Sequence, residues 1–177
     1  DYEGRPTRVF AWLGIPADAS ADTPVPAMVL VHGGGGTAFR QWVDEWTQRG
    51  YAAISIAVEG QTSTQATEEE RAAGEAVGSW RKHAMSGPAR VGAYGDTGRP
   101  LQDQWMYHAV SATAVAGELM RSLPEVNAEA VGLMGISWGG VIASTVVGLD
   151  DRFAWAIPVY GNGHKYTQCN RADCVQC

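Results

Sequence analysis

Gly135-Ile136-Ser137-Trp138-Gly139-Gly140 lies between an apolar run at residues 130–134 and a second apolar run that begins at Val141. This order predicts a strand, a sharp turn and a helix, with the serine in the turn. Glycines two residues before and two residues after the serine let the strand and the helix approach each other closely. A G-x-S-x-G turn in this context is typical of a nucleophile elbow, which makes Ser137 a candidate nucleophile.

The motif alone leaves a second interpretation open, a glycine-rich turn with an incidental serine. In the catalytic interpretation the helix expected after Ser137 has a role, and the second glycine motif described below decides between the two interpretations. Its first N–H groups and the positive end of its dipole would face the serine. The backbone N–H of Trp138 is therefore a candidate donor to a substrate oxygen that gains negative charge.

A second glycine motif, His32-Gly33-Gly34-Gly35-Gly36, directly follows the apolar run at residues 27–31. An HGGG sequence after a strand is typical of the loop that completes the oxyanion hole in serine esterases. Glycine is suited to this loop because no side chain keeps its N–H from the substrate. A phosphate-binding loop is disfavoured, since the motif lacks the Lys and Ser/Thr of a P-loop. We therefore expect Gly34 or Gly35, together with Trp138, to form an oxyanion hole.

In this order the two motifs resemble the α/β-hydrolase fold, and more narrowly the acetyl xylan esterases, dienelactone hydrolases and prolyl-oligopeptidase-like serine hydrolases. The run at residues 148–161, with its Asp150-Asp151-Arg152-Phe153 segment, resembles the same branch. The resemblance implies a doubly wound, mostly parallel α/β sheet. It also implies a serine esterase that cleaves small-molecule short-chain acyl or acetyl esters through an acyl-enzyme on Ser137, without a cofactor.

The apolar periodicity along the chain agrees with this fold. Strands are predicted at residues 9–15, 27–31, 51–58 and 153–160, and helices around residues 39–50 and 104–123. The apolar face of the second helix consists of Trp105, Ala109, Ala112, Ala116, Leu119 and Leu123. A strand, a helix and a strand in succession predict a right-handed parallel crossover.

Residues 59–104 show no clear periodicity beyond a short helical pattern within 68–77, and a long irregular segment of this kind is usually functional. Trp80, His83 and Tyr94 are candidates for lining a pocket, although surface packing is the favoured explanation for any one of them. We interpret His108, within the second predicted helix, as a hydrogen-bonded structural histidine.

In the related branch, further strands carry the acid and the histidine of the triad after the point at which this chain reaches Gly161. The resemblance therefore implies a C-terminally truncated hydrolase core at residues 1–161 and an atypical Cys-rich tail at 162–177. After Ser137 the only candidate base is His164, and the candidate acids are Asp150, Asp151 and Asp173. One hypothesis is a catalytic set of Ser137, His164 and Asp173. The alternative is a truncated, non-catalytic protein that binds a ligand or a partner.

The tail holds all three cysteines, Cys169, Cys174 and Cys177. With His164 they form a Cys₃His set that suits structural zinc, and their spacing also resembles part of an iron–sulfur motif. Unpaired surface thiols explain the same residues without a metal. We favour that explanation and expect no metal.

The chain of 177 residues has 13 Lys and Arg against 19 Asp and Glu, a net charge of −6. This balance disfavours nucleic acid and anionic membranes as partners. Every apolar run is shorter than the roughly 18 residues that span a bilayer, so we expect a soluble protein, cytoplasmic or secreted.

Truncation would also leave the strand at 153–160 on the edge of the sheet. Its apolar residues Phe153, Trp155, Ile157 and Val159 would then lose their cover. Exposed apolar edge strands pair readily with other chains. The sequence therefore predicts a homodimer or larger homo-oligomer, in which the tail of one chain lies near Ser137 of another.

Overall fold

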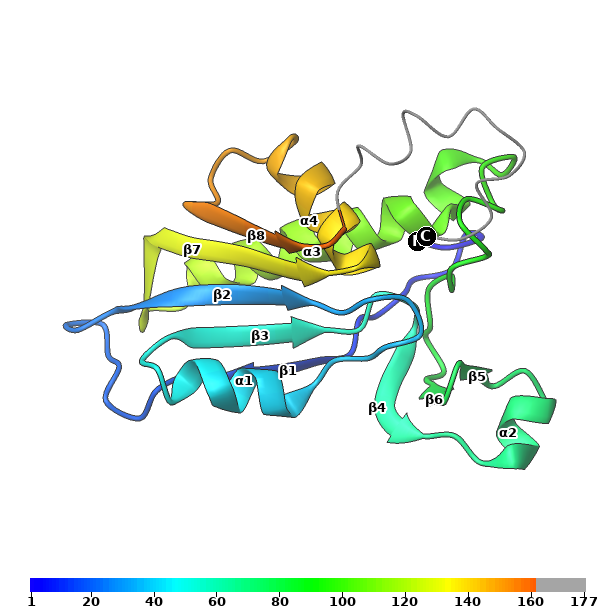
Figure 1. The fold of residues 1–177 in the computed structure, drawn as a ribbon, viewed down its shortest axis with the longest axis horizontal. Helices are drawn as coiled ribbons and strands as arrows, with labels where there is room; N and C mark the ends of the chain where they lie inside the picture. The colour runs from blue at the N-terminus through cyan, green and yellow to red at the C-terminus, as the bar shows by residue number, and fades with distance from the viewer. Residues whose placement is uncertain (162–177) are drawn as a thin grey trace.

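The computed structural model describes residues 1–161 and has a five-stranded main sheet in the order β1-β3-β2-β7-β8 (Figure 1). β1 runs antiparallel to β3, and all other neighbours are parallel. The strands are β1 (Ala11–Gly14), β2 (Val25–Val31), β3 (Ala52–Ile56), β7 (Val126–Ile136) and β8 (Trp155–Val159). The predicted mostly parallel α/β sheet is confirmed.

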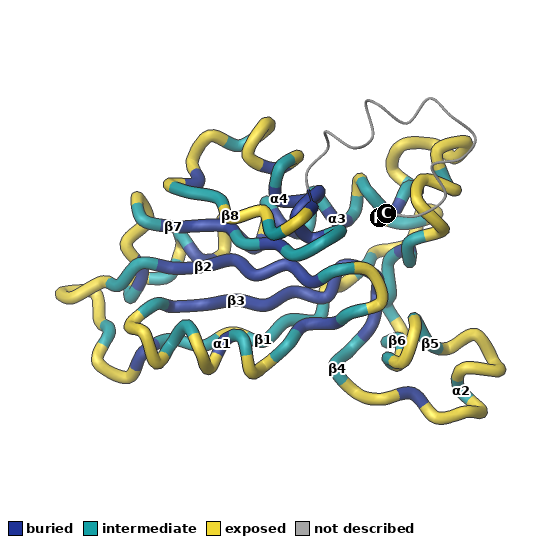
Figure 2. Tube along the Cα trace, viewed as in Figure 1, coloured by how far each residue is buried: buried dark blue, intermediate teal, exposed yellow. Residues whose placement is uncertain are grey.

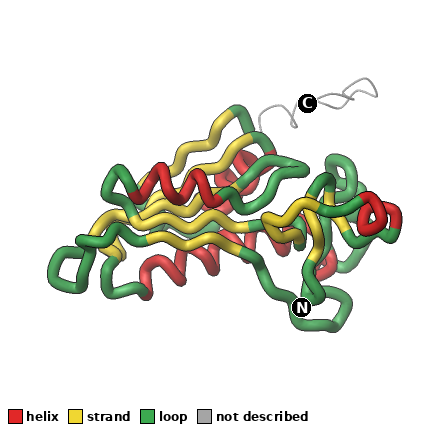
Figure 3. The backbone as a smooth tube through the Cα atoms, turned by 90° about the horizontal axis from the view of Figure 1, so that it is seen from below, coloured by secondary structure: helices red, strands yellow, loops and turns green. Residues whose placement is uncertain are grey.

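Helices cover both faces of this sheet (Figure 3). Helix α1 (Arg40–Thr47) packs against β1 and β3 on one face, whereas α3 (Trp105–Ser122) and α4 (Trp138–Val147) pack together on the other. Gly50, the predicted cap after α1, has a positive φ of 83°. The sheet is therefore doubly wound, as the sequence predicts.

The hydrophobic core follows the alternation of side chains along the central strand β2. Ala27, Val29 and Val31 belong to the larger cluster, under α3 and α4. Met28 and Leu30 point the other way, into a smaller cluster with Val43 of α1. Burial is deepest along β2 and β3 (Figure 2), so the loops that follow these strands start from a rigid base.

Within residues 59–104, a small antiparallel sheet of order β4-β6-β5 lies beside the main sheet, which the sequence did not predict. It consists of β4 (Gln61–Gln65), β5 (Ala76–Val77) and β6 (Trp80–Lys82). The short 3-10 helix η1 (Leu101–Asp103) precedes α3. The expected helix within 68–77 is only α2 (Glu68–Ala72). A capping box between Thr67 and Glu70 starts this helix, and Gly74, with a φ of 76°, follows its end.

Two expectations about apolar side chains were wrong. Leu119 is 44% exposed, because α3 turns Gly117 and Met120 toward the sheet instead. Phe153 precedes β8 and is buried in the α3 and α4 cluster, so it does not extend the exposed row of the strand. β8 itself does lie at the edge of the sheet, with Ile157 40% exposed.

Candidate active site

Ser137 occupies the predicted turn between β7 and α4, with φ 55° and ψ −118°. A positive φ is uncommon for a residue with a side chain and is retained only where the surroundings enforce it. Here close packing enforces it. A Cβ at Gly135 would overlap the Gly139 carbonyl, and a Cβ at Gly139 would overlap the Val31 carbonyl. The glycines of the motif therefore set the geometry of the turn.

The glycine loop at residues 33–36 lies against this serine. A Cβ at Gly33 would be 3.2 Å from the Cβ of Ser137 and 3.7 Å from its Oγ. Both motifs open into one cavity of about 350 Å³, which is lined by Gly33, Gly34, Gly35, Gly36, Phe39, Trp42, Ile136, Ser137 and Tyr160. Two segments far apart in the sequence thus meet at a single site.

The two candidate glycine donors, Gly34 and Gly35, differ in whether their N–H group already has an acceptor. The Gly35 N–H donates to Oε2 of Glu59 at 2.9 Å. The Gly34 N–H has no acceptor within residues 1–161. Trp138 is the first residue of α4, and the first N–H groups of a helix project beyond its end. Gly34 is therefore better placed than Gly35 to act with Trp138 on a ligand.

His32 holds the loop and cannot serve as a base. Its Nε2 accepts the Val58 N–H at 3.0 Å, so the ring proton lies on Nδ1, which donates to the Gly33 carbonyl at 2.6 Å. Burial lowers the pKa of His32 to about 4. The ring is neutral near pH 7, and both of its nitrogens are engaged.

Sequence reasoning missed Glu59, Gln61 and Arg90, which surround the same loop. Gln61 Nε2 donates to the Gly36 carbonyl at 2.8 Å, and Glu59 Oε1 lies 3.2 Å from Arg90 Nε. The available signal was position: Glu59 and Gln61 closely follow the buried strand β3, and ligand sites in open α/β sheets gather at the carboxyl ends of strands.

Aromatic residues pack around the Trp138 ring. Tyr94 and Trp105 meet it edge to face at 5.5 Å, and the Arg90 guanidinium lies 5.3 Å from its centre. Trp80 donates its Nε1–H to the Gly35 carbonyl at 3.1 Å. Trp80 thus contacts a residue that lines the cavity and Tyr94 contacts the neighbouring Trp138, but neither lines the cavity itself.

The remaining described histidines lie elsewhere. His108 pairs through Nε2 with the Gln102 carbonyl at 2.8 Å, in agreement with a structural role. Burial lowers the pKa of His83, and no hydrogen-bond partner for its Nε2 is found in residues 1–161. No hydrogen bond joins Ser137 Oγ to any residue of that range.

His164, Asp173 and the three cysteines lie outside the described residues, so the predicted triad partners and the Cys₃His set stay untested. Up to residue 161, no three His, Cys, Asp or Glu side chains are grouped to hold a metal ion. Over the same residues, none of the helices has the length and apolar character to cross a membrane.

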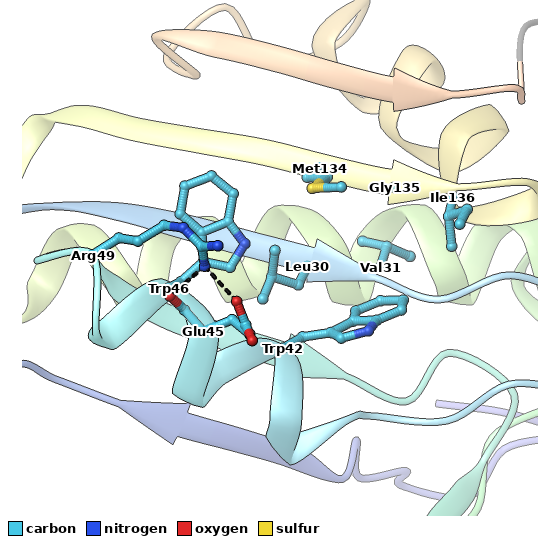
Figure 4. A pocket seen from close by; sticks show the side chains of 9 residues that line it. All are labelled: Leu30, Val31, Trp42, Glu45, Trp46, Arg49, Met134, Gly135 and Ile136. Atoms are coloured by element: carbon cyan, nitrogen blue, oxygen red, sulfur yellow. Dashed lines mark hydrogen bonds and ion pairs between the residues drawn. The ribbon is translucent and has the colours of Figure 1, made fainter.

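A second cavity, of about 310 Å³, lies between α1 and the strands β2 and β7 (Figure 4). It shares Trp42 and Ile136 with the first cavity. Its lining is mostly apolar, and an ion pair of 2.6 Å between Glu45 and Arg49 lies beside it. The α1 face of β7 is thus partly open in the described chain.

Comparison with known proteins identifies the family of this chain. Residues 2–171 match the family model described as acetyl xylan esterase (AXE1), a range that includes part of the tail. No curated protein matches significantly.

Among solved structures, an acetyl xylan esterase from Paenibacillus sp. R4 superimposes with a TM-score of 0.65 at 23% identity, over 88% of this chain and 45% of that one. Acetyl xylan esterase 1 from Thermoanaerobacterium sp. JW/SL YS485 gives 0.59 at 19% identity, over 84% and 42%. The chain spans less than half the length of either protein, and at these identities the likeness shows the α/β-hydrolase fold. Because the family model matches nearly the whole sequence, the protein belongs to the acetyl xylan esterase (AXE1) family.

Proposed function

We propose that this chain is a serine carboxylic-ester hydrolase that cleaves short-chain acyl or acetyl esters, with Ser137 as the nucleophile. The observation that carries the proposal is the contact between the 33–36 loop and Ser137 in one cavity. Membership of the AXE1 family supports the acyl class.

In this mechanism the Ser137 Oγ attacks the ester carbonyl, and its proton passes to a base. The carbonyl oxygen becomes an oxyanion, which the N–H groups of Gly34 and Trp138 stabilise. Collapse of this intermediate breaks the bond to the alcohol, which leaves with the proton from the base. Water then cleaves the acyl-enzyme by the same steps and regenerates the serine.

For the base we propose His164, oriented by Asp173. The support is the start of the tail: a Cβ at Gly161 would overlap the Ser137 carbonyl, so the chain leaves β8 beside the serine. A residue three positions later is within about 10 Å of Gly161 along an extended chain. His164→Ala and Asp173→Ala should lower the turnover of an aryl acetate by orders of magnitude, whereas His108→Ala should not. Unchanged turnover in His164→Ala would mean that the base comes from elsewhere.

Labelling with a fluorophosphonate tests the nucleophile on the full chain. We expect labelling of Ser137 and turnover of an aryl acetate, both lost in Ser137→Ala. Ser144→Ala is the matched control, since this serine lies in the same helix α4 away from the cavity. If the wild type is unlabelled and inactive, the chain is instead a non-catalytic hydrolase-fold protein that binds a ligand or a partner.

We further propose that the chain forms a homodimer or larger assembly through the edge strand β8. The support is the exposure of Ile157 at that edge, together with the partly open face beside it. Exposed apolar edges are normally covered.

A further inference from the structure

The residues that hold the 33–36 loop form one buried polar network, and each contact falls on a different backbone group of the loop. His32 donates to the Gly33 carbonyl, Glu59 accepts the Gly35 N–H, and Gln61 donates to the Gly36 carbonyl. The Gly34 N–H has no acceptor within residues 1–161 and is therefore left for a ligand. The network therefore orients this donor by fixing its own peptide group through the Gly33 carbonyl and the next peptide group through the Gly35 N–H.

Arg90 connects this network to the second donor. Its Nε lies 3.2 Å from Glu59 Oε1, and its guanidinium lies 5.3 Å from the centre of the Trp138 ring. A Cβ at Gly34 would be 2.7 Å from Arg90 Nη2 and 2.9 Å from Trp138 Cδ1. The guanidinium is thus in contact with both Gly34 and Trp138, which lie on two different segments of the chain.

Burying an ion pair such as Glu59–Arg90 costs free energy of hydration, unless the attraction between the charges and further hydrogen bonds compensate for it. The Glu59 side chain is only 2% exposed, and the Arg90 side chain is 25% exposed. Burial raises the pKa of Glu59, and the Gly35 N–H and Arg90 act in the opposite direction. Buried ion pairs contribute little net stability but specify geometry in some proteins. This pair lies where small displacements have large effects on rate.

From these contacts we propose that Glu59 and Arg90 are positioning residues, which hold the N–H groups of Gly34 and Trp138 in register around the oxyanion. The inference rests on the proposed function of Ser137. Neither side chain contacts the reacting atoms. Glu59 acts through Gly35, and Arg90 acts through Gly34 and Trp138.

The first test compares Glu59→Ala and Glu59→Gln with the wild type in aryl acetate turnover. Gln keeps an acceptor for the Gly35 N–H and loses the charge that holds Arg90, so kcat/KM should fall about 10-fold, and about 100-fold in Glu59→Ala. KM should stay nearly constant. The matched control is Glu118→Gln on α3, which removes the charge from an exposed 2.7 Å ion pair with Arg152 and should leave the rate unchanged.

The affinity for a trifluoromethyl ketone distinguishes positioning of the oxyanion donors from a purely structural role. This ketone forms a tetrahedral adduct with the serine. If the pair positions the oxyanion donors, this affinity should fall in step with kcat/KM across the variants. Unchanged affinity in folded variants would overturn the proposal.

Hydrogen exchange gives a readout that does not depend on activity. In both Glu59 variants the peptide that contains residues 33–36 should exchange faster, at least 10-fold for the Gly35 N–H in Glu59→Ala, and not in Glu118→Gln. Unchanged exchange overturns the proposal even if the enzyme is active. An unreactive wild-type serine instead contradicts the proposed function, and the exchange result alone then decides whether Glu59 positions the loop.

Discussion

The Cα of Gly139 lies directly against the carbonyl oxygen of Val31, which a Cβ at position 139 would overlap. Val31 is the last residue of β2, and Gly139 is in the first turn of α4. This contact joins the two motifs of the site, because the 33–36 loop begins just after Val31 and Ser137 lies just before α4. The distance between loop and serine therefore depends on the absence of a side chain at position 139.

Gly139→Ala should accordingly destabilise the protein, although alanine is the better helix former. Overpacking against backbone cannot be relieved by a side-chain rotation, so we expect a loss of about 3 kcal/mol in the free energy of unfolding. Urea denaturation followed by circular dichroism measures it.

The matched control is Gly148→Ala, at the other end of the same helix. A Cβ there would be 3.4 Å from the Thr145 carbonyl, and the φ of −77° suits alanine. This variant should differ from the wild type by less than about 1 kcal/mol. Equal stability of Gly139→Ala and Gly148→Ala would contradict the packing argument.

The positive φ of Ser137 leads to a separate prediction about the free energy of unfolding. Glycine adopts a φ of 55° without steric cost, and the Ser137 side chain caps no N–H of α4. We therefore expect Ser137→Gly to be more stable than Ser137→Ala by about 1 kcal/mol, with both inactive. If Ser137→Gly were less stable than Ser137→Ala, the positive φ at position 137 would carry no steric strain.

The buried His32 predicts a dependence of stability on pH. Its pKa is lowered from 6.5 to about 4, so the unfolded chain takes up the proton first as the pH falls. The stabilising contribution is complete above pH 6.5 and is lost between pH 6.5 and 4, by about 3 kcal/mol in total. The free energy of unfolding of His32→Gln should be lower at pH 7 and should fall less steeply over this range. Parallel curves for the two proteins would contradict this assignment.

The fold was largely predictable because its elements carry strong local signals. The buried run before His32, the 3.6-residue periodicity around Val43 and the glycines around Ser137 each point to one element. The polar segment at residues 61–65 has no such signal, since Gln-Thr-Ser-Thr-Gln shows no apolar alternation. Its pairing with β6 depends on contacts from a distant part of the chain, which explains why the small sheet was missed.

The candidate site, like the fold, could be predicted from the sequence only where local signals are strong. Glycine motifs identify Ser137 and the 33–36 loop, because backbone geometry dictates residue type there. Nothing local distinguishes Gly34 from Gly35, since the difference comes from Glu59 in another loop. Arg90 is a still harder case, because it reaches Trp138 from an irregular segment with no periodicity.

The proposed assembly predicts the behaviour of the β8 edge. The Val159 carbonyl accepts the Ser137 N–H at 2.9 Å, so the backbone groups of Val159 face β7 and those of Pro158 face outward. Proline removes one outward donor, and association should therefore depend on side chains such as Ile157 as well as on strand pairing.

At micromolar concentration, light scattering of the full chain should give at least twice the monomer mass of 18.9 kDa. Ile157→Lys should shift the protein toward the monomer, because a buried unpaired ammonium opposes association. Val115→Lys is the control, since this valine is 67% exposed on α3, away from β8. A monodisperse, active wild-type monomer would refute the assembly, and equal effects of the two lysines would show that the contact does not involve β8.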